Sequence, residues 1–419
     1  MIVCILAASL VTADTPVAAA QSAASNLTLT AATESALQNN AQLKSLRADW
    51  EAQSERPVQA GALPNPTLMF GNMDTTWGGD WPDAAQKRVS LQQAFPWFGK
   101  RRLRERIAAK DAETAKHELD AMTRDVVMQV KQTFYDLYAQ QRVIAVTREE
   151  TAVLQRIAEI AKTMYAAGSR EQTDMIQAQT ELTRLRQQLL SLAAQEGSLR
   201  ARLNALLDRR ADTPLPPLAK PPEATITDAG KALFDQAAEH SPEVLAAQTR
   251  VERSSLQERL MEKESKPDYQ LGLEYRELRD NDDMLMVTVG VDLPIWLGKN
   301  RAAVREASKM REASEAARQA AERENAFFVD DARSRFEAAR RTLDLTRTEL
   351  IPQAEARLNA HEAAYRNGKA DFMDLLGSER FLLDTRIMEI RAEAELGSQA
   401  ARFERAAGTA AYSVPEIPR

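Results

Sequence analysis

Two Gly–Lys pairs, Gly99–Lys100 and Gly298–Lys299, are the first residues whose types and spacing could do chemistry. In a phosphate-binding loop, another glycine lies five residues before the glycine of such a pair, and the lysine is followed by a Ser or Thr that binds magnesium. This chain has other residues at these positions, namely Ala94 and Leu293 before the pairs and Arg101 and Asn300 after them. Neither pair therefore predicts a nucleotide site.

Histidine and methionine offer few ligands for a metal ion. The sequence HEAAY at His361 has Tyr365 where a zinc protease has its second histidine, and the remaining histidines are His117 and His240. Four methionines on or beside expected strands carry sulfur that Cu(I) or Ag(I) accepts, although methionine more often serves packing: Met69, Met73, Met284 and Met286. We expect no catalytic residue, no cofactor and no resident metal, and hence no enzyme.

The composition indicates long helices rather than ordinary globular packing. Charged residues make up 28% of the 419 residues and aromatic residues only 5%, a mixture typical of coiled coils. The net charge is -6, and Lys and Arg are interleaved with Asp and Glu instead of forming one basic face. A nucleic-acid partner is therefore not expected.

The N-terminus predicts a secretory signal peptide over residues 1–20. Apolar residues run from Ile2 to Val11, and small residues follow up to a cleavage point near Ala20. No positive residue precedes the apolar run, so either the true start lies upstream or the signal is atypical. A buried N-terminal segment and a lipid anchor on Cys4 stay open as alternatives. Elsewhere no run reaches the roughly 18 apolar residues of a transmembrane helix, so a membrane span would need β-strands.

The chain repeats itself with a period of about 200 residues. Asn39–Ala52 aligns with His240–Arg253, and Pro66 with Pro267, at an offset of 201. Further matches lie at offsets of 199 and 200: Trp97, Gly99 and Lys100 with Trp296, Gly298 and Lys299, and Tyr165, Gly168 and Asp174 with Tyr365, Gly368 and Asp374. We divide the chain into a first repeat (21–211), a Pro-rich connector (212–228), a second repeat (229–408) and a C-terminal tail (409–419).

Each repeat is expected to contain a helix, two strands and a long helical hairpin. The strands are expected at about 66–72 and 87–95, and at about 267–276 and 284–293, because apolar and polar residues alternate there over the length of a tilted membrane strand. An ordinary half-buried sheet would show the same alternation. Lys100 to Tyr165 contains no proline and would span about 100 Å as one helix. Hairpin tips are expected near 168 and 368, and leucines from Leu182 to Leu206 then follow a coiled-coil spacing.

Four membrane strands are too few to close into a barrel by themselves. An open sheet edge in lipid leaves backbone groups unpaired at a cost of several kcal/mol each, and bacterial barrels use about eight strands or more. We therefore expect the chain to share its barrel with other copies, three of which would supply about twelve strands and a cylinder of about twelve helices. The predicted fold is mainly α with a small β part.

These residues resemble the outer membrane efflux protein family, the TolC-like channels. The resemblance rests on the duplicated layout, on AGALPNPTLMFGN before the first hairpin, on LQQAFPWFGKRRLRERIAAKDAE after it, and on YRNGKADFMDLLGSE at the second tip. It implies a TolC-like fold with long antiparallel coiled-coil helical hairpins and four transmembrane β-strands per chain in a trimeric α/β barrel. It also implies an outer-membrane location with a periplasmic helical extension.

The resemblance assigns roles to particular residues. It implies contact with a periplasmic adaptor at the tips, by Tyr165, Gly168, Tyr365 and Gly368, and a pore gate at Asp174 and Asp374. Gly377 departs from the pattern, because the family leads us to expect a second acidic residue there. The junction between barrel and tunnel is expected at Pro96, Trp97, Gly99 and Lys100 in the first repeat, where Lys100 should begin the helix in water. The same junction is expected at Pro294, Trp296, Gly298 and Lys299 in the second repeat.

The function implied by the resemblance is a passive exit duct. Its partners would be two further copies of the chain, a periplasmic adaptor, an inner-membrane pump of the resistance–nodulation–division type and outer-membrane lipid. The LPNP and Gly–Lys–Arg elements are similar to the branch that exports heavy metals such as cobalt, zinc, cadmium or copper. Drug efflux and type I protein secretion stay open, as does a periplasmic coiled-coil adaptor or scaffold as an alternative of another class.

Overall fold

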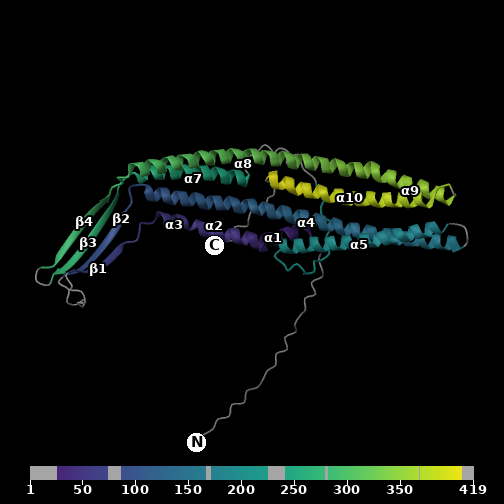
Figure 1. Cartoon of the computed structure of the whole chain (residues 1–419), viewed down its shortest axis with the longest axis horizontal. Helices are drawn as coiled ribbons and strands as arrows, with labels where there is room; N and C mark the ends of the chain where they lie inside the picture. Colours follow the sequence, from purple (N-terminus) through teal and green to yellow (C-terminus); the bar gives the residue numbers. More distant parts are fainter. Residues whose placement is uncertain are drawn as a thin grey trace, which may run out of the picture.

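The chain forms an elongated rod of helices with a small sheet at one end (Figure 1). The computed structural model describes residues 26–73, 86–166, 171–224, 241–278, 282–367 and 369–407. The expected signal peptide, the end of the connector, both tip glycines (Gly168 and Gly368) and the C-terminal tail from residue 409 lie outside the described residues.

The elements follow one another in the same order in both halves of the chain. The first half contains α1 (Leu29–Asn39), α2 (Ala41–Ser54), α3 (Arg56–Gly61), β1 (Thr67–Met73), β2 (Gln86–Phe95), α4 (Lys100–Ala166) and α5 (Gln172–Leu206). The second contains α7 (Pro242–Glu264), β3 (Asp268–Leu278), β4 (Met284–Asp292), α8 (Leu297–Leu345), a single π-helical turn η2 (Thr346–Leu350), α9 (Ile351–Arg366) and α10 (Phe372–Ala407).

Short helices precede β1 where the sequence predicts one helix. Asn40 separates α1 from α2, because its backbone leaves the helical region and its side chain accepts hydrogen bonds from the N–H groups of Gln42 and Leu43. This is the geometry of a helix N-cap. The corresponding segment of the second half is the single helix α7 among the described residues, with Ser241 at its N-cap.

The sheet is antiparallel with the strand order β1-β2-β3-β4. Its register places apolar residues of all four strands in the same rows: Phe70, Val89, Tyr275 and Leu285 in one row, and Leu68, Leu91, Leu273 and Val287 in the next. These side chains are 38–67% exposed. An exposed apolar surface of this extent marks contact with lipid or protein.

The opposite face of the sheet carries polar groups. Ser90 lies opposite Glu274, and Arg88 opposite Arg276. The two faces thus differ as expected for a sheet with lipid on one side and water on the other. No described helix combines the length and the apolar character that a membrane span needs.

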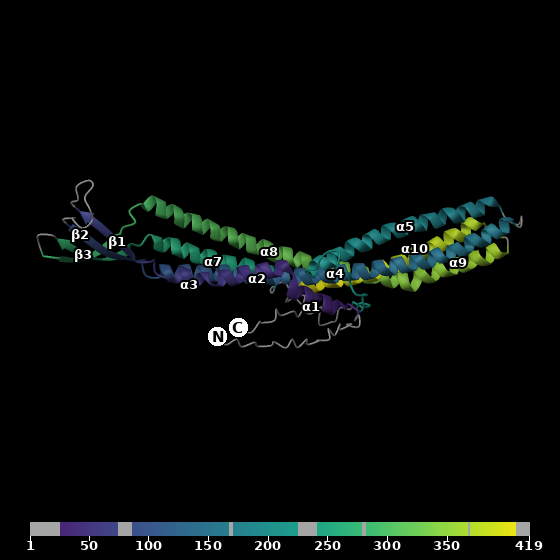
Figure 2. The ribbon, with the colours of Figure 1, turned by 90° about the horizontal axis from the view of Figure 1, so that it is seen from below.

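Each strand is joined to one helix: α3 precedes β1, α4 follows β2, α7 precedes β3 and α8 follows β4. These helices therefore lie side by side in the same order as the strands. Near the sheet α3 lies beside α4, α4 beside α7, and α7 beside α8. Figures 1 and 2 show α4 running the length of the rod, with α5, α9 and α10 in the half farthest from the sheet. In that half α4 packs on both α5 and α10.

The helices are held together by narrow apolar seams. Val143, Leu185, Leu192 and Leu383 are at most 4% exposed and belong to one cluster between α4, α5 and α10. The leucine spacing predicted from Leu182 onward is confirmed, since the leucines at 182, 185, 192 and 203 are all buried. Leu189, Leu199 and Leu206 of the same spacing are partly buried and pack against these clusters, as a coiled-coil seam requires.

One π-helical turn distinguishes the second long helix from the first. From Gly99 to Gly168 the first repeat counts one residue fewer than the second from Gly298 to Gly368. The helix of the first repeat is α4 throughout, whereas the second contains the π turn η2. A π turn accommodates one inserted residue. Pro352 follows it and lacks the N–H that would extend the α-helical ladder.

Candidate functional site: the two ends of the helical rod

The first strand-to-helix junction is a tight turn. β2 ends at Phe95, and Pro96 cannot extend the ladder because it has no N–H. Gly99 has a φ of 88°, in the region that favours glycine, and α4 begins at the next residue. Trp97 stacks on Tyr269 of β3, with ring centroids 5.7 Å apart and an interplanar angle of 22°.

Lys100 forms a buried clamp between the two halves of the chain. Its side chain is 2% exposed, and its Nζ lies 2.8 Å from Oδ1 of Asp268, 3.1 Å from Oε2 of Glu264 and 3.1 Å from the carbonyl oxygen of Lys266. The same Asp268 oxygen accepts the backbone N–H of Trp97 at 2.6 Å. α4 begins at Lys100 as expected, but the expectation that this side chain lies in water is wrong, because α7 and β3 cover it.

The second junction differs from the first. α8 already begins at Leu297, so Gly298 lies inside a helix and, unlike Gly99, has no positive φ. Trp296 is 72% exposed, and Lys299 is exposed as well. The expectation of two identical junctions is therefore wrong. The difference arises because β4 and α8 form one edge of the chain, whereas β2 and α4 lie in its middle.

At the far end of the rod, the first hairpin turns between α4 and α5. Tyr165 is 42% exposed near the end of α4. Asp174 lies in the first turn of α5 and is 8% exposed. An acidic residue in a first turn interacts favourably with the helix dipole.

The second hairpin turns between α9 and α10. The ring of Tyr365 lies 5.8 Å from that of Phe372, which is 1% exposed. Oδ2 of Asp374 accepts the backbone N–H of Asp371 at 3.4 Å, and Asp374 itself is exposed. A Cβ added at Gly377 would have no heavy atom within 4 Å. The two gate candidates thus have different surroundings, because Asp174 is buried and Asp374 is open.

Charged residues that the sequence analysis did not single out connect the two hairpins near the tips. Glu181 of α5 is paired with Arg184 at 2.6 Å and with Arg380 of α10 at 2.5 Å. Burial raises the pKa of Glu181, but the hydrogen bonds from the two arginines outweigh burial and hold the pKa below its usual value. No motif marks this contact, since the partners are far apart in sequence.

Glu150 of α4 lies close to the same region. Burial, together with the negative charge of Glu379, raises the pKa of Glu150 from 4.5 to about 7. Burial and the charge of Glu362 also raise the pKa of Glu379. The tip half of the rod therefore contains carboxyl groups that hold protons to higher pH than carboxyl groups in water.

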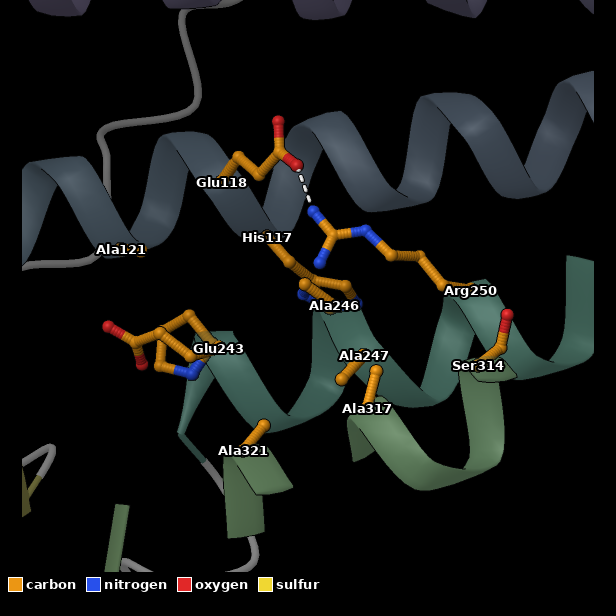
Figure 3. A pocket seen from close by; sticks show the side chains of 11 residues that line it. His117, Glu118, Ala121, Glu243, Ala246, Ala247, Arg250, Ser314, Ala317 and Ala321 are labelled. Carbon is orange, nitrogen blue, oxygen red and sulfur yellow. Dashed lines mark hydrogen bonds and ion pairs between the residues drawn. The ribbon is translucent and has the colours of Figure 1, made fainter. Parts of the chain in front are cut away.

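A cavity of about 290 Å³ lies between α4, α7 and α8 (Figure 3). Five of its eleven lining residues are alanines, and Glu118 and Arg250, which also line it, form an ion pair. Burial raises the pKa of Glu243, but the hydrogen bond from Ser241 and the charge of Arg405 hold it below its usual value. Among the described residues, no group of at least three His, Cys, Asp or Glu side chains could hold a metal ion.

Comparison with known proteins gives a family and several relatives. The family model described as "Outer membrane efflux protein" matches residues 32–209 and 233–409. The chain is 26% identical over 372 residues to the cobalt-zinc-cadmium resistance protein CzcC of Cupriavidus metallidurans, covering 87% of this chain and 86% of the relative.

Solved structures have the same fold at low sequence identity. A membrane protein from Pseudomonas aeruginosa matches with a TM-score of 0.79 at 19% identity, covering 91% of this chain and 93% of its own. The outer membrane protein VceC of Vibrio cholerae matches at 0.76 and 18% identity, covering 91% and 96%. CusC matches at 0.78 and 14% identity, covering 90% and 91%.

Proposed function

Because the chain belongs to the outer membrane efflux protein family, a family of transport channels, we propose that it is the outer-membrane exit duct of a tripartite system that exports heavy-metal cations. The observation that carries the duct is the sheet, whose apolar rows are exposed on one face across all four strands. The helices that continue from these strands form a charged rod suited to the periplasm.

Three copies of the chain form the duct in this proposal. β1 and β4 are edge strands of the described sheet, and unpaired edges are costly in lipid. Three four-stranded sheets joined edge to edge give about twelve strands, within the range of bacterial barrels. The helices that follow them give a tunnel of the same symmetry.

The heavy-metal cargo is supported by the relative CzcC, whose name refers to cobalt, zinc and cadmium resistance and whose similarity extends over 87% of this chain. A duct does not select its cargo, so the pump would determine it. An inner-membrane pump of the resistance–nodulation–division type and a periplasmic adaptor complete the proposed system. A periplasmic scaffold is the weaker alternative, because the family match spans both halves of the chain.

The site residues receive roles within this proposal. The tip residues Tyr165 and Tyr365, with Gly168 and Gly368, contact the adaptor. Asp174 and Asp374 act in the closed gate, and the exposed Asp374 is better placed to meet passing cations than the buried Asp174. The junction residues of both repeats join the barrel to the tunnel.

Deletion of the gene in its native host tests the proposal. The deletion strain should accumulate more zinc and cadmium and tolerate less of each salt, whereas efflux of a lipophilic dye should not change. Restoring the gene should restore tolerance. Impaired dye efflux with unchanged metal tolerance would reject the cargo but keep the duct, and unchanged export of metal, dye and secreted protein would reject the duct.

A further inference from the structure

Two methionines of β4, Met284 and Met286, lie on the polar face of the sheet. They are two residues apart in the strand, so their side chains leave it on the same side. The register places Met286 opposite Glu274 and Met284 opposite Arg276. Leu285, which stands between the two methionines, belongs to an apolar row of the other face. Both thioethers therefore point to the side of the sheet that meets water in the proposed duct.

Packing within the chain does not account for these two side chains. Met284 is 47% exposed and Met286 is 36% exposed. Counted back from the proline that follows each strand, the same two positions of β2 hold the polar residues Gln86 and Arg88. A strand of a second copy that paired with the edge strand β4 would bond to its backbone and leave this face open. The duplication and the closed barrel thus leave the methionines without a structural reason.

Thioether sulfur is a soft and uncharged ligand that favours Cu(I) and Ag(I) over hard cations. Residues two apart in a strand have Cα atoms roughly 7 Å from each other. Because methionine is unbranched and has three rotatable bonds, two such side chains can close on one ion. Glu274 adds a carboxylate within reach, since directly opposite residues have Cβ atoms about 4.5–5.5 Å apart. The three side chains can therefore offer two sulfur ligands and one oxygen ligand to a single ion.

The charges around the two methionines disfavour a hard divalent cation. Nε of Arg276 donates a hydrogen bond to Oε1 of Glu274 at 2.5 Å. Arg88 lies in the same row of the sheet as Arg276 and Met284. A divalent ion such as Zn²⁺ is usually held by thiolate, imidazole or carboxylate ligands, and here it would meet two guanidinium groups and one carboxylate. A monovalent ion bound to uncharged sulfur meets less repulsion, because its own charge is half as large.

We propose that Met284 and Met286, with Glu274 as a third ligand, bind a soft monovalent cation, Cu(I) or Ag(I), on the inner wall of the barrel. The inference rests on the proposed duct and adds soft monovalent ions to the cargo that the duct carries. One site per chain gives three sites around the lumen of a trimer. Conduction requires an ion to leave its site as well as enter it, and an exposed site with two thioethers and one carboxylate can release its ion.

Silver binding by the purified, detergent-solubilised protein tests the site. Ag(I) is the probe because oxygen does not oxidise it, and the buffer contains no chloride because chloride precipitates silver. The background is Cys4→Ser, since a thiolate binds soft metals more tightly than a thioether does. Equilibrium dialysis, with silver counted by elemental mass spectrometry, should find one ion per chain fewer after Met284→Leu and Met286→Leu together. Either change alone should weaken binding at this site by about tenfold or more.

Two other methionines provide matched controls. Met69→Leu removes a lone thioether from the row of the sheet that also contains Met286, and Met310→Leu removes one that is 63% exposed on α8. Neither change should alter silver binding at the site. Leucine keeps the approximate volume of methionine, so the thermal midpoints of all variants should stay close to that of the background. Binding should also stay constant between about pH 6 and pH 8, because a thioether has no proton to release.

The outcomes separate this site from the proposed duct. If the variant with Met284→Leu and Met286→Leu binds as much silver as its background, the site is wrong and the duct stands. An equal loss in Met69→Leu or Met310→Leu would show that silver binds methionines in general, which also overturns the site. Loss of Zn²⁺ binding together with silver binding would reject the assignment to soft monovalent ions. Unchanged export after deletion of the gene would reject the duct and the cargo role, whereas the silver ligands would stand.

Discussion

Replacing Lys100 by Met should weaken the chain far more than the same change at Lys299, its counterpart in the second repeat. Methionine keeps the volume of the lysine stem but removes the charge that Glu264 and Asp268 share. Lys299 is exposed in the single chain and has no ion pair among the described residues, so its loss removes no comparable charge contact within the chain. The duplication thus supplies a control at the same position of the fold.

The expected magnitude follows from the exposure of the partners. Removing one member of a buried ion pair costs about 3–5 kcal/mol, because the other charge stays buried without compensation. The side chains of Glu264 and Asp268 are 34% and 30% exposed, so water can solvate part of each carboxylate. We therefore expect a loss of about 2 kcal/mol for Lys100→Met and a change within about 0.5 kcal/mol for Lys299→Met.

The measurement is the thermal midpoint of the detergent-solubilised protein, followed by near-ultraviolet circular dichroism. Trp97 reports on this site, because it stacks on Tyr269 and its backbone N–H bonds to Asp268. Lys100→Met should lower the midpoint by several degrees. A double variant that adds Asp268→Asn should recover part of the loss, because Asp268 then carries no uncompensated charge and Glu264 keeps Arg104 as an ion-pair partner at 2.9 Å. Equal effects of Lys100→Met and Lys299→Met would refute the reasoning.

Three further changes test other parts of the structure. Gly397→Ala should destabilise the protein by about 1–3 kcal/mol, because the new Cβ would lie 2.4 Å from the ring of Tyr135. Gly197→Ala, whose Cβ would have no heavy atom within 4 Å, should stabilise the protein by up to about 1 kcal/mol. The thermal midpoints of the two variants are compared with that of the wild type. Glu150→Gln should remove a pH dependence of the stability. The pKa of Glu150 is about 7 in the folded state and 4.5 in the unfolded state, so the unfolded state loses its proton first as the pH rises. The stabilising contribution of this group is therefore present below pH 4.5 and is lost by about pH 7. Midpoints that fall equally in wild type and variant across this window would contradict it. Gly377→Asp, at an open position, should raise cation selectivity in planar bilayers without changing the thermal midpoint; unchanged selectivity would place the constriction elsewhere.

Much of the fold was predictable because it depends on local patterns. The alternation along β3 and β4 predicts strands, and the leucine spacing after Asp174 predicts the buried seam of α5. The duplication predicts that both halves follow the same order of elements. These features depend on residues close in sequence, and their periods differ between strand and helix.

The environment of the site residues was not predictable in the same way. Lys100 and Lys299 stand in nearly identical motifs, yet one is buried and the other exposed, because only Lys100 has α7 and β3 beside it. Asp174 and Asp374 likewise differ in exposure although both lie in a first helical turn. The pairing of Glu181 with Arg380 depends on tertiary packing, which no spacing in the sequence encodes.

The π turn at Thr346–Leu350 has a consequence for how such a chain can change during evolution. One residue inserted into a continuous α-helix would turn every later side chain by about 100° and lengthen the helix by about 1.5 Å. Held in a π turn, the extra residue leaves the side chains of α9 on the faces that their counterparts in α4 use. The two repeats can thus differ in length by one residue while the helix after the π turn keeps its packing, so the two halves of the chain can diverge and still share one fold.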